Sequence, residues 1–343
     1  MVKKGLLASI LFVVFLFGCS SNNEEIENVA KETEEPTSDT KNNDQSTVDE
    51  DNIEEATLPT ASLKKLDEGE DVQHLQQILK DIGFPIEISG TYDQQTTWAI
   101  TEIQLNEDSL YINGVYDENV KNVIETYTEN GTTVEEPYTL EEPKHAEFET
   151  EDVENPYEIL SVVNKTYALP YDYEPEDLTV PEVRFPFTED DPKKQLRQEA
   201  ADALEDLFAN AEQVGIQLFA QSGFRSYERQ EAIFAANVDQ HGEEHANTYS
   251  ARPGESEHQT GLVMDITSES VDFDLITDFG ETDEGKWVAE HAHEYGFIIR
   301  YLEGKEDITR YQYEPWHLRY VGVEAATEMK ENEITLEEYL HVE

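Results

Sequence analysis

Two acid-rich stretches divide the chain and limit where it can fold. The first runs from about residue 20 to residue 61 and consists mainly of Asn, Glu, Asp, Ser and Thr, with hardly any aliphatic cluster. Acidic residues and prolines return between residues 129 and 154. Such segments bury too little apolar surface to offset the entropy of ordering the chain. We therefore predict a disordered acidic tether over 19–61, an acidic linker over 129–154, and folded domains at 62–128 and 155–343.

The balance of charge narrows the classes of partner. The chain has 23 Lys and Arg residues against 78 Asp and Glu residues, which gives a formal net charge of -55. Nucleic acid is excluded as a partner because its backbone carries charge of the same sign. All eight arginines lie between Arg184 and Arg319. We interpret this grouping as local positive charge that attracts a substrate carboxylate, with inheritance unrelated to the substrate as the alternative.

The first residues have the pattern of an export signal. Lysines precede an apolar run over residues 5–18, which is short for a membrane-spanning helix but typical of a secretory signal. Leu16–Cys19 resembles the lipobox of bacterial lipoproteins, in which the cysteine becomes the lipid-bearing first residue after cleavage. Cys19 is the only cysteine, so an internal disulfide is excluded. We expect a lipoprotein signal peptide over 1–18 and an extracytoplasmic protein anchored to the bacterial membrane through Cys19, facing the cell wall.

A short unit occurs twice in the first folded region. Ile88–Asp93 and Ile112–Asp117 each contain a glycine turn, an aromatic residue and an aspartate placed to cap a helix. Apolar residues at helical spacing precede the first unit and end at Gly83. The pattern predicts a compact all-α helical bundle from Leu63 to Tyr127.

This bundle resembles the peptidoglycan-binding domain type 1 over about sixty residues. The resemblance implies binding to the glycan of the cell wall. The sequence departs from the family at Ile103–Gln104, where Phe-Gln is usual. A structural spacer without glycan affinity is the alternative.

The last region alternates helical and extended patterns. We expect helices over 196–211, 228–234 and 286–295, and strands over 216–220, 262–266, 297–301 and 316–321. Within the strand over 262–266, Val263 and Asp265 share one face and Met264 the other, because side chains alternate. The order of elements predicts an α+β domain around a mostly antiparallel sheet, separate from the helical bundle.

Three motifs lie on this scaffold: Ser222–Ser226 (Ser-Gly-Phe-Arg-Ser), Ser256–Ile266 (Ser-Glu-His-Gln-Thr-Gly-Leu-Val-Met-Asp-Ile) and Glu314–His317 (Glu-Pro-Trp-His). Together they are similar to the D-alanyl-D-alanine carboxypeptidases of the VanY type. These are zinc peptidases that trim the stem peptides of peptidoglycan. The resemblance extends from about residue 157 to residue 320.

The resemblance implies a zinc site held by His258, Asp265 and His317, with Glu314 as the catalytic carboxylate. The residue types agree with that role, since catalytic zinc sites use three protein ligands and leave a position open for water. Glu314 could take a proton from that water and pass it to the leaving amine.

Further residues of these motifs suit the binding of a peptide end. Arg225 can present a planar fork to a carboxylate or to a developing oxyanion. Gln230 and Ser256 would add hydrogen bonds to the peptide. Trp316 is interpreted as either a wall of the pocket or part of the core.

Other histidines are interpreted as unrelated to the metal. His241–His245 imitates the helical His-Glu-x-x-His motif, but its glutamates are at the wrong positions, and we predict a solvated loop. His291 and His293 are predicted to lie at the surface.

The sequence thus predicts a lipid-anchored cell-wall hydrolase that removes the C-terminal D-alanine of stem peptides by attack of a metal-activated water, with Zn²⁺ as cofactor. Two alternatives stay open. One is an L,D-carboxypeptidase that acts on shortened stem peptides. The other is a non-catalytic peptidoglycan-binding lipoprotein.

Overall fold

The computed structural model describes residues 57–135, 137 and 150–342. The predicted signal peptide, Cys19 and most of the tether and linker lie outside these residues. In the described part of the chain, no helix is both long enough and apolar enough to cross a bilayer.

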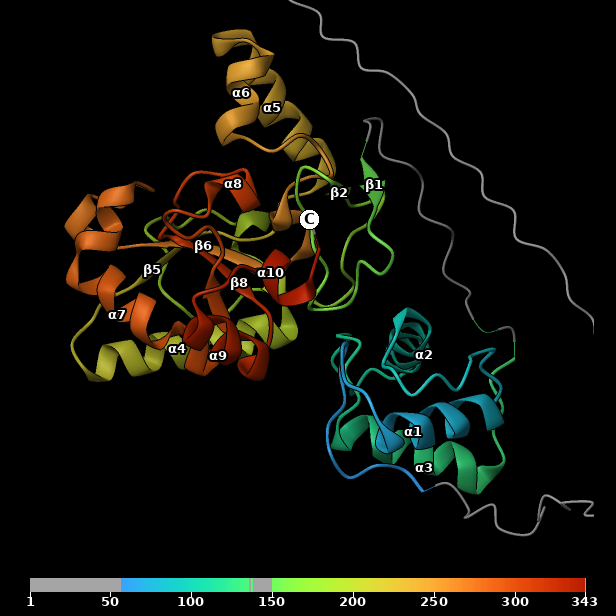
Figure 1. Ribbon diagram of the computed structural model, residues 1–343. Helices are drawn as coiled ribbons and strands as arrows, with labels where there is room; N and C mark the ends of the chain where they lie inside the picture. The colour runs from blue at the N-terminus through green and yellow to red at the C-terminus, as the bar shows by residue number, and fades with distance from the viewer. Residues whose placement is uncertain (1–56, 136, 138–149, 343) are drawn as a thin grey trace, which may run out of the picture. The chain divides into compact units, whose positions relative to one another are not determined.

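The first folded part, over the described residues up to 135, contains three helices: α1 (Glu70–Asp81), α2 (Gln94–Leu105) and α3 (Glu118–Asn130). Figure 1 shows them as a small helical group in blue to green. Their apolar faces form a core of their own that includes Leu75, Leu79, Ile100, Ile103, Val120 and Ile124. The predicted helical bundle is confirmed.

The repeated unit has a clear structural reason. Asp93 and Asp117 each accept a hydrogen bond from a backbone N–H in the first turn of the following helix, as predicted for caps. A buried glutamine stabilises each glycine turn: Gln76 Oε1 accepts from the N–H of Gly90 at 2.9 Å, and Gln104 Oε1 accepts from the N–H of Gly114 at 2.8 Å. Gln104 therefore stabilises the fold of this part. Its neighbour Ile103 does so as well, because it lies in the core.

The second folded part combines short strands and helices. Its strands are β1 (Glu151–Asp152), β2 (Tyr167–Ala168), β3 (Leu178–Thr179), β4 (Leu196–Arg197), β5 (Phe219–Ser222), β6 (Val263–Thr267), β7 (Phe297–Ile299) and β8 (His317–Tyr320). Its helices are α4 (Gln198–Gln213), α5 (Tyr227–His241), α6 (Glu243–Tyr249), α7 (Asp283–His291), α8 (Glu306–Thr309), α9 (Val323–Asn332) and α10 (Leu336–Leu340). Short 3-10 helices are η1 (Pro192–Lys194), η2 (Glu257–Thr260), η3 (Glu269–Val271), η4 (Thr277–Glu281) and η5 (Ala292–Tyr295).

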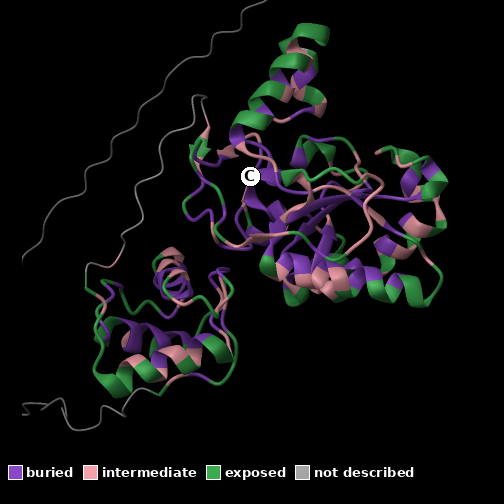
Figure 2. Ribbon diagram, turned by 180° about the vertical axis from the view of Figure 1, so that it is seen from behind, coloured by how far each residue is buried: buried purple, intermediate pink, exposed green. Residues whose placement is uncertain are grey.

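Four strands form the central sheet, in the order β5-β6-β8-β7, and all neighbours are antiparallel. Helices α4 and α9 are drawn on the same side of it in Figure 1. Leu204 and Met329 from these helices share a buried core with Met264 and Leu318 of the sheet. Figure 2 shows that the two middle strands, β6 and β8, are buried, whereas most of α5 and α6 is exposed. The predicted α+β fold with a mostly antiparallel sheet is confirmed.

Two local predictions are wrong. The strand predicted over 216–220 begins only at Phe219, because the N–H of Ile216 still bonds Ala211 O at the end of α4, at 2.9 Å. The segment His241–His245 is not a loop, since α5 ends at His241 and α6 begins at Glu243. Gly242 has a φ of 80°, which allows two helices to meet at a single residue. His241 and His245 are nevertheless exposed, as expected.

Candidate metal centre

The structure brings the three predicted ligands together. His258, Asp265 and His317 are 5%, 4% and 4% exposed, and one ligand atom from each lies within 4.8 Å of the others. His258 Nε2 is 3.4 Å from Asp265 Oδ2, and His317 Nδ1 is 3.0 Å from Asp265 Oδ1. The two imidazole rings are nearly perpendicular, at 85°.

Strand register explains how two of these residues meet. Asp265 in β6 is paired directly with His317 in β8. Met264 and its alternate neighbour Ile266 lie in the core, so Asp265 faces the opposite side of the sheet. His258 comes from η2, and its Nδ1 lies 2.8 Å from the carbonyl oxygen of Gly223. This contact turns Nε2 of His258 toward Asp265.

The charges around the cluster suit a cation. Burial, and then the nearby Arg225, lower the pKa of His258 to about 3, so its ring is neutral and able to act as a ligand. Burial opposes protonation of His317, but the neighbouring carboxylates of Asp265 and Glu257 raise its pKa to about 9. Asp265 and Glu257 thus place negative charge beside His317, which favours a cation there.

The donor set fits zinc. Two imidazole nitrogens and one carboxylate oxygen are a common ligand set for catalytic zinc. Asp265 Oδ1 is buried and has no hydrogen-bond partner, although buried acceptors are normally satisfied. A metal ion among the three residues would satisfy it.

Glu314 lies beside the cluster. Its Oε2 is 3.7 Å from His317 Nδ1, and the side chain is 13% exposed. Burial, reinforced by the charge of Asp265, raises the pKa of Glu314 to about 7 even though His317 and Arg225 act to lower it. A carboxyl group with a pKa near neutrality is suited both to accept and to donate a proton.

Arg225 follows β5 and points into the same pocket. Its Nη1 donates to Gln230 Oε1 at 2.8 Å, and its Nη2 donates to Ser222 Oγ at 3.3 Å. Gln230 also donates through Nε2 to the carbonyl oxygen of Ala251 at 2.6 Å. The oxygen and the nitrogen of the Gln230 amide therefore both have hydrogen-bond partners within the protein. Through its oxygen, Gln230 holds the guanidinium of Arg225 in place.

The pocket at the cluster has a volume of about 260 Å³. Ser256 lies in its wall and is 5% exposed. Trp316 both lines the pocket and belongs to the core, so the two interpretations of this residue are both correct. His291 and His293 lie outside the cluster and outside this pocket.

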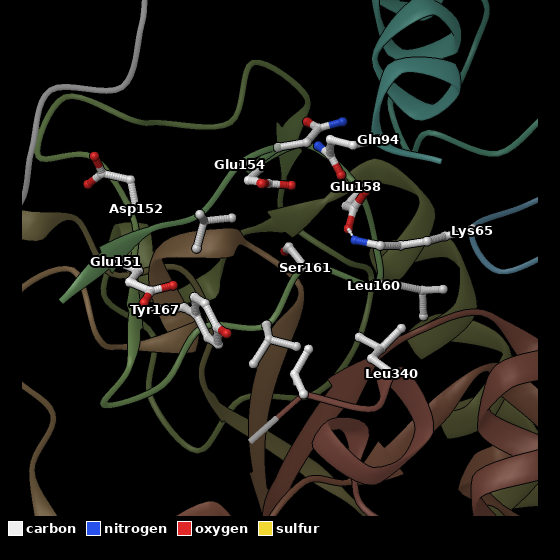
Figure 3. Close-up of a pocket in the computed structure, with 14 residues that line it drawn as sticks. Lys65, Gln94, Glu151, Asp152, Glu154, Glu158, Leu160, Ser161, Tyr167 and Leu340 are labelled. Atoms are coloured by element: carbon white, nitrogen blue, oxygen red, sulfur yellow. Dashed lines mark hydrogen bonds and ion pairs between the residues drawn. The ribbon is translucent and has the colours of Figure 1, made fainter. Parts of the chain in front are cut away.

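A second pocket is less suited to an anionic peptide end. It has a volume of about 290 Å³ and is shown in Figure 3. Glu151, Asp152, Glu154 and Glu158 line it, and the lysine in its wall, Lys65, is already paired with Glu158. We therefore place the candidate site at the histidine cluster.

The interpretation of the arginines is wrong for three of them. Arg197, Arg300 and Arg319 are fully buried and bind acidic side chains of the protein. Arg225 is the arginine that lines the pocket of the cluster.

Sequence reasoning also missed Glu257, which is adjacent to His258. Burial opposes ionisation of Glu257, but Arg300 and Arg319 hold its pKa well below the usual range. Its place inside the Ser-Glu-His motif was the signal available.

Each of the two folded parts matches a known protein-family model. Residues 193–323 match the model described as VanY, D-alanyl-D-alanine carboxypeptidase. Residues 68–125 match the model described as "Putative peptidoglycan binding domain".

Individual proteins are also similar. The chain is 56% identical over 189 residues to "Putative carboxypeptidase YodJ" of Bacillus subtilis, a match that covers 55% of this chain and 69% of that protein. It is 34% identical over 183 residues to the bifunctional D-Ala-D-Ala dipeptidase and D-Ala-D-Ala carboxypeptidase VanXYC of Enterococcus gallinarum. This match covers 52% of this chain and 92% of that protein. A solved structure of the LdcB LD-carboxypeptidase superposes with a TM-score of 0.56 at 53% identity, covering 59% of this chain and 94% of that one.

Proposed function

Because the chain belongs to the VanY family of D-alanyl-D-alanine carboxypeptidases, we propose that it removes the terminal D-alanine from peptidoglycan stem peptides. The observation that carries the proposal is the buried cluster of His258, Asp265 and His317 beside Glu314. A zinc ion held by these three ligands would lower the pKa of a bound water and polarise the scissile carbonyl.

Arg225 binds the carboxylate at the end of the peptide. Its guanidinium is held by Gln230 and Ser222, so the fork is oriented before substrate arrives. A planar fork forms two parallel hydrogen bonds to a carboxylate, and such charge-assisted bonds are stronger than neutral ones. The peptide end is thereby directed toward the histidine cluster.

Glu314 transfers the proton between the attacking water and the leaving group. It accepts a proton from the attacking water and delivers it to the nitrogen of the departing D-alanine. Its position next to His317 and its raised pKa support both halves of this transfer.

Replacing Arg225 with lysine should weaken substrate use more than folding. A hydrogen bond to a charged group contributes about 1.5–3 kcal/mol, so we expect kcat/KM to fall by about 10- to 100-fold, mainly through KM. Steady-state kinetics on a stem pentapeptide measure this. Arg229→Lys is the matched control, since Arg229 is exposed on α5. Equal kinetics for both variants would contradict the role of Arg225.

A second candidate activity is L,D-carboxypeptidase action on the shortened stem. The similarity to the LdcB structure favours it. Purified stem tetrapeptides and pentapeptides, incubated separately and analysed by mass spectrometry, distinguish the two. Loss of D-alanine from the pentapeptide alone supports D,D cleavage, and loss from the tetrapeptide alone supports L,D cleavage. Loss from neither would support the non-catalytic alternative.

The helical part, over 62–128, would hold the enzyme on its polymeric substrate. Residues 68–125 match the peptidoglycan-binding model, and the departure at Ile103 lies in the core, where the side chain is 2% exposed. Binding of this part to peptidoglycan raises the effective concentration of stem peptides at the catalytic pocket.

We also propose that Cys19 carries a lipid anchor, with the tether over 19–61 between the membrane and the folded parts. Cys19→Ser should release the protein to the medium or leave it unprocessed. Fractionation of cells followed by immunoblotting measures this, with Ser20→Ala as the neighbouring control. Retention of Cys19→Ser in the membrane fraction would contradict the anchor.

A further inference from the structure

A buried acidic residue stands behind the metal cluster. Glu257 is 1% exposed. Its Oε1 accepts hydrogen bonds from Arg300 Nε and from Arg319 Nη1, both at 2.8 Å. Two guanidinium groups, one from Arg319 in β8 and one from Arg300 directly after β7, therefore fix the carboxylate through one of its oxygens.

The other oxygen faces His317. Glu257 Oε2 and His317 Nε2 are both buried without a hydrogen-bond partner, and they lie 3.6 Å apart. Unsatisfied buried groups are rare because each costs about 1–3 kcal/mol. Two such atoms that face each other, one a potential donor and one an acceptor, are natural partners after a small shift.

The two histidines of the cluster present opposite nitrogens. The Nδ1 of His258 contacts the carbonyl oxygen of Gly223, so its Nε2 faces Asp265. His317 is reversed: its Nδ1 faces Asp265, and its Nε2 faces Glu257. For His317 to bind a metal through Nδ1, its proton must reside on Nε2.

We propose that Glu257 is a positioning residue for the metal: it accepts the Nε2 proton of His317, fixes that tautomer, and directs Nδ1 into the cluster. A carboxylate in this place also makes the imidazole a more basic ligand. This inference rests on the metal site of the proposed function, and it adds a residue outside the three ligands.

The same network supplies a matched control. Arg300 also donates to Glu337 in α10, from Nη2 to Oε1 at 2.6 Å and from Nη1 to Oε2 at 2.8 Å. Glu337 is 1% exposed and accepts a further bond from Asn164. Glu337→Gln therefore removes a buried charge beside the same arginine without removing the carboxylate that faces His317.

The experiment compares zinc affinity in purified full chains of Glu257→Gln and Glu337→Gln. Competition with a chromophoric chelator gives the dissociation constant, at a temperature at which near-UV circular dichroism shows each variant folded. Supporting groups of metal ligands are typically worth 10- to 100-fold in affinity, so we expect a loss of that size for Glu257→Gln. Glu337→Gln should stay within about three-fold of the unaltered chain, although both variants melt earlier. Equal affinities in the two variants would overturn the proposal.

A second measurement needs no variant. In ¹⁵N-histidine-labelled unaltered protein, two histidines should shift on addition of zinc, one bound through Nε2 and one through Nδ1. The one bound through Nδ1 should show a slowly exchanging, downfield Nε2 proton. Two identical tautomers, or a rapidly exchanging Nε2 proton, would overturn the role of Glu257 while leaving the zinc site intact. Absence of zinc binding by the unaltered chain would overturn the proposed function as well.

Discussion

Replacement of Asp265 by alanine is expected to remove bound zinc and activity together. Asp265 lies between the two histidines, 3.4 Å from His258 Nε2 and 3.0 Å from His317 Nδ1. Groups that only support metal ligands are worth 10- to 100-fold in affinity. We therefore expect the loss of a ligand itself to weaken zinc binding by more than ~100-fold. Elemental analysis of the purified protein and a stem-peptide assay measure the two effects.

The same loss should lower the melting temperature. A metal that binds only the folded state contributes about 2.7 kcal/mol when its free concentration is 100 times Kd. In a domain of about 150–250 residues, this corresponds to a fall in Tm of about 5–11 °C on chelation. Calorimetry with and without a chelator tests it, and Asp265→Ala should already melt early without the chelator.

Asp278→Ala is the matched control, because Asp278 is exposed in η4. It should keep zinc, activity and Tm close to those of the unaltered chain. Full activity of Asp265→Ala, or of protein stripped of zinc and comparable divalent ions, would contradict the metal-dependent mechanism.

Features set by neighbouring residues could be predicted from the sequence. An aspartate before a helical pattern satisfies the first free N–H groups of that helix, and Asp93 and Asp117 do so. Glycines in the repeated unit adopt positive φ at Gly90 and Gly114, which few other residues tolerate. Both effects act over a few residues, so a pattern in one sequence is enough to predict them.

The assembly of the site depends on strand order, which periodicity does not encode. Asp265 meets His317 because β6 pairs with β8, while β7, which comes between them in the chain, lies at the edge of the sheet. Alternation predicted the face on which Asp265 lies but gave no partner for it. The family resemblance grouped the ligands, and only the fold explains their meeting.

The buried ion pairs could not be predicted from the sequence, for a related reason. Charged residues are seldom fully buried, so the arginines, Arg300 and Arg319 among them, were interpreted as charge that attracts a substrate, and Glu257 was given no role. They are buried because they neutralise one another across distant segments of the chain. Spacing and composition do not indicate which charged residues form such a pair.

Replacement of Glu314 by glutamine should reduce kcat by roughly 10²- to 10⁴-fold, the usual contribution of a general acid or base. Glutamine keeps the size of the side chain but does not accept a proton from water. Zinc content should persist, because the ligand cluster comprises His258, Asp265 and His317 and does not include Glu314. KM should change little, because carboxylate binding is assigned to Arg225.

Zinc content, Tm and kcat measured on one preparation separate this role from a structural one. Arg225 acts on the charge of Glu314, so a purely structural Glu314 would serve as a partner for that cation. In that case Glu314→Gln would lower Tm and leave kcat within a few-fold. Glu303→Gln makes the same substitution at an exposed position and should leave all three quantities unchanged. Near-normal kcat in a zinc-loaded Glu314→Gln chain would remove Glu314 from the mechanism, and proton transfer would then have to come from another group in the pocket.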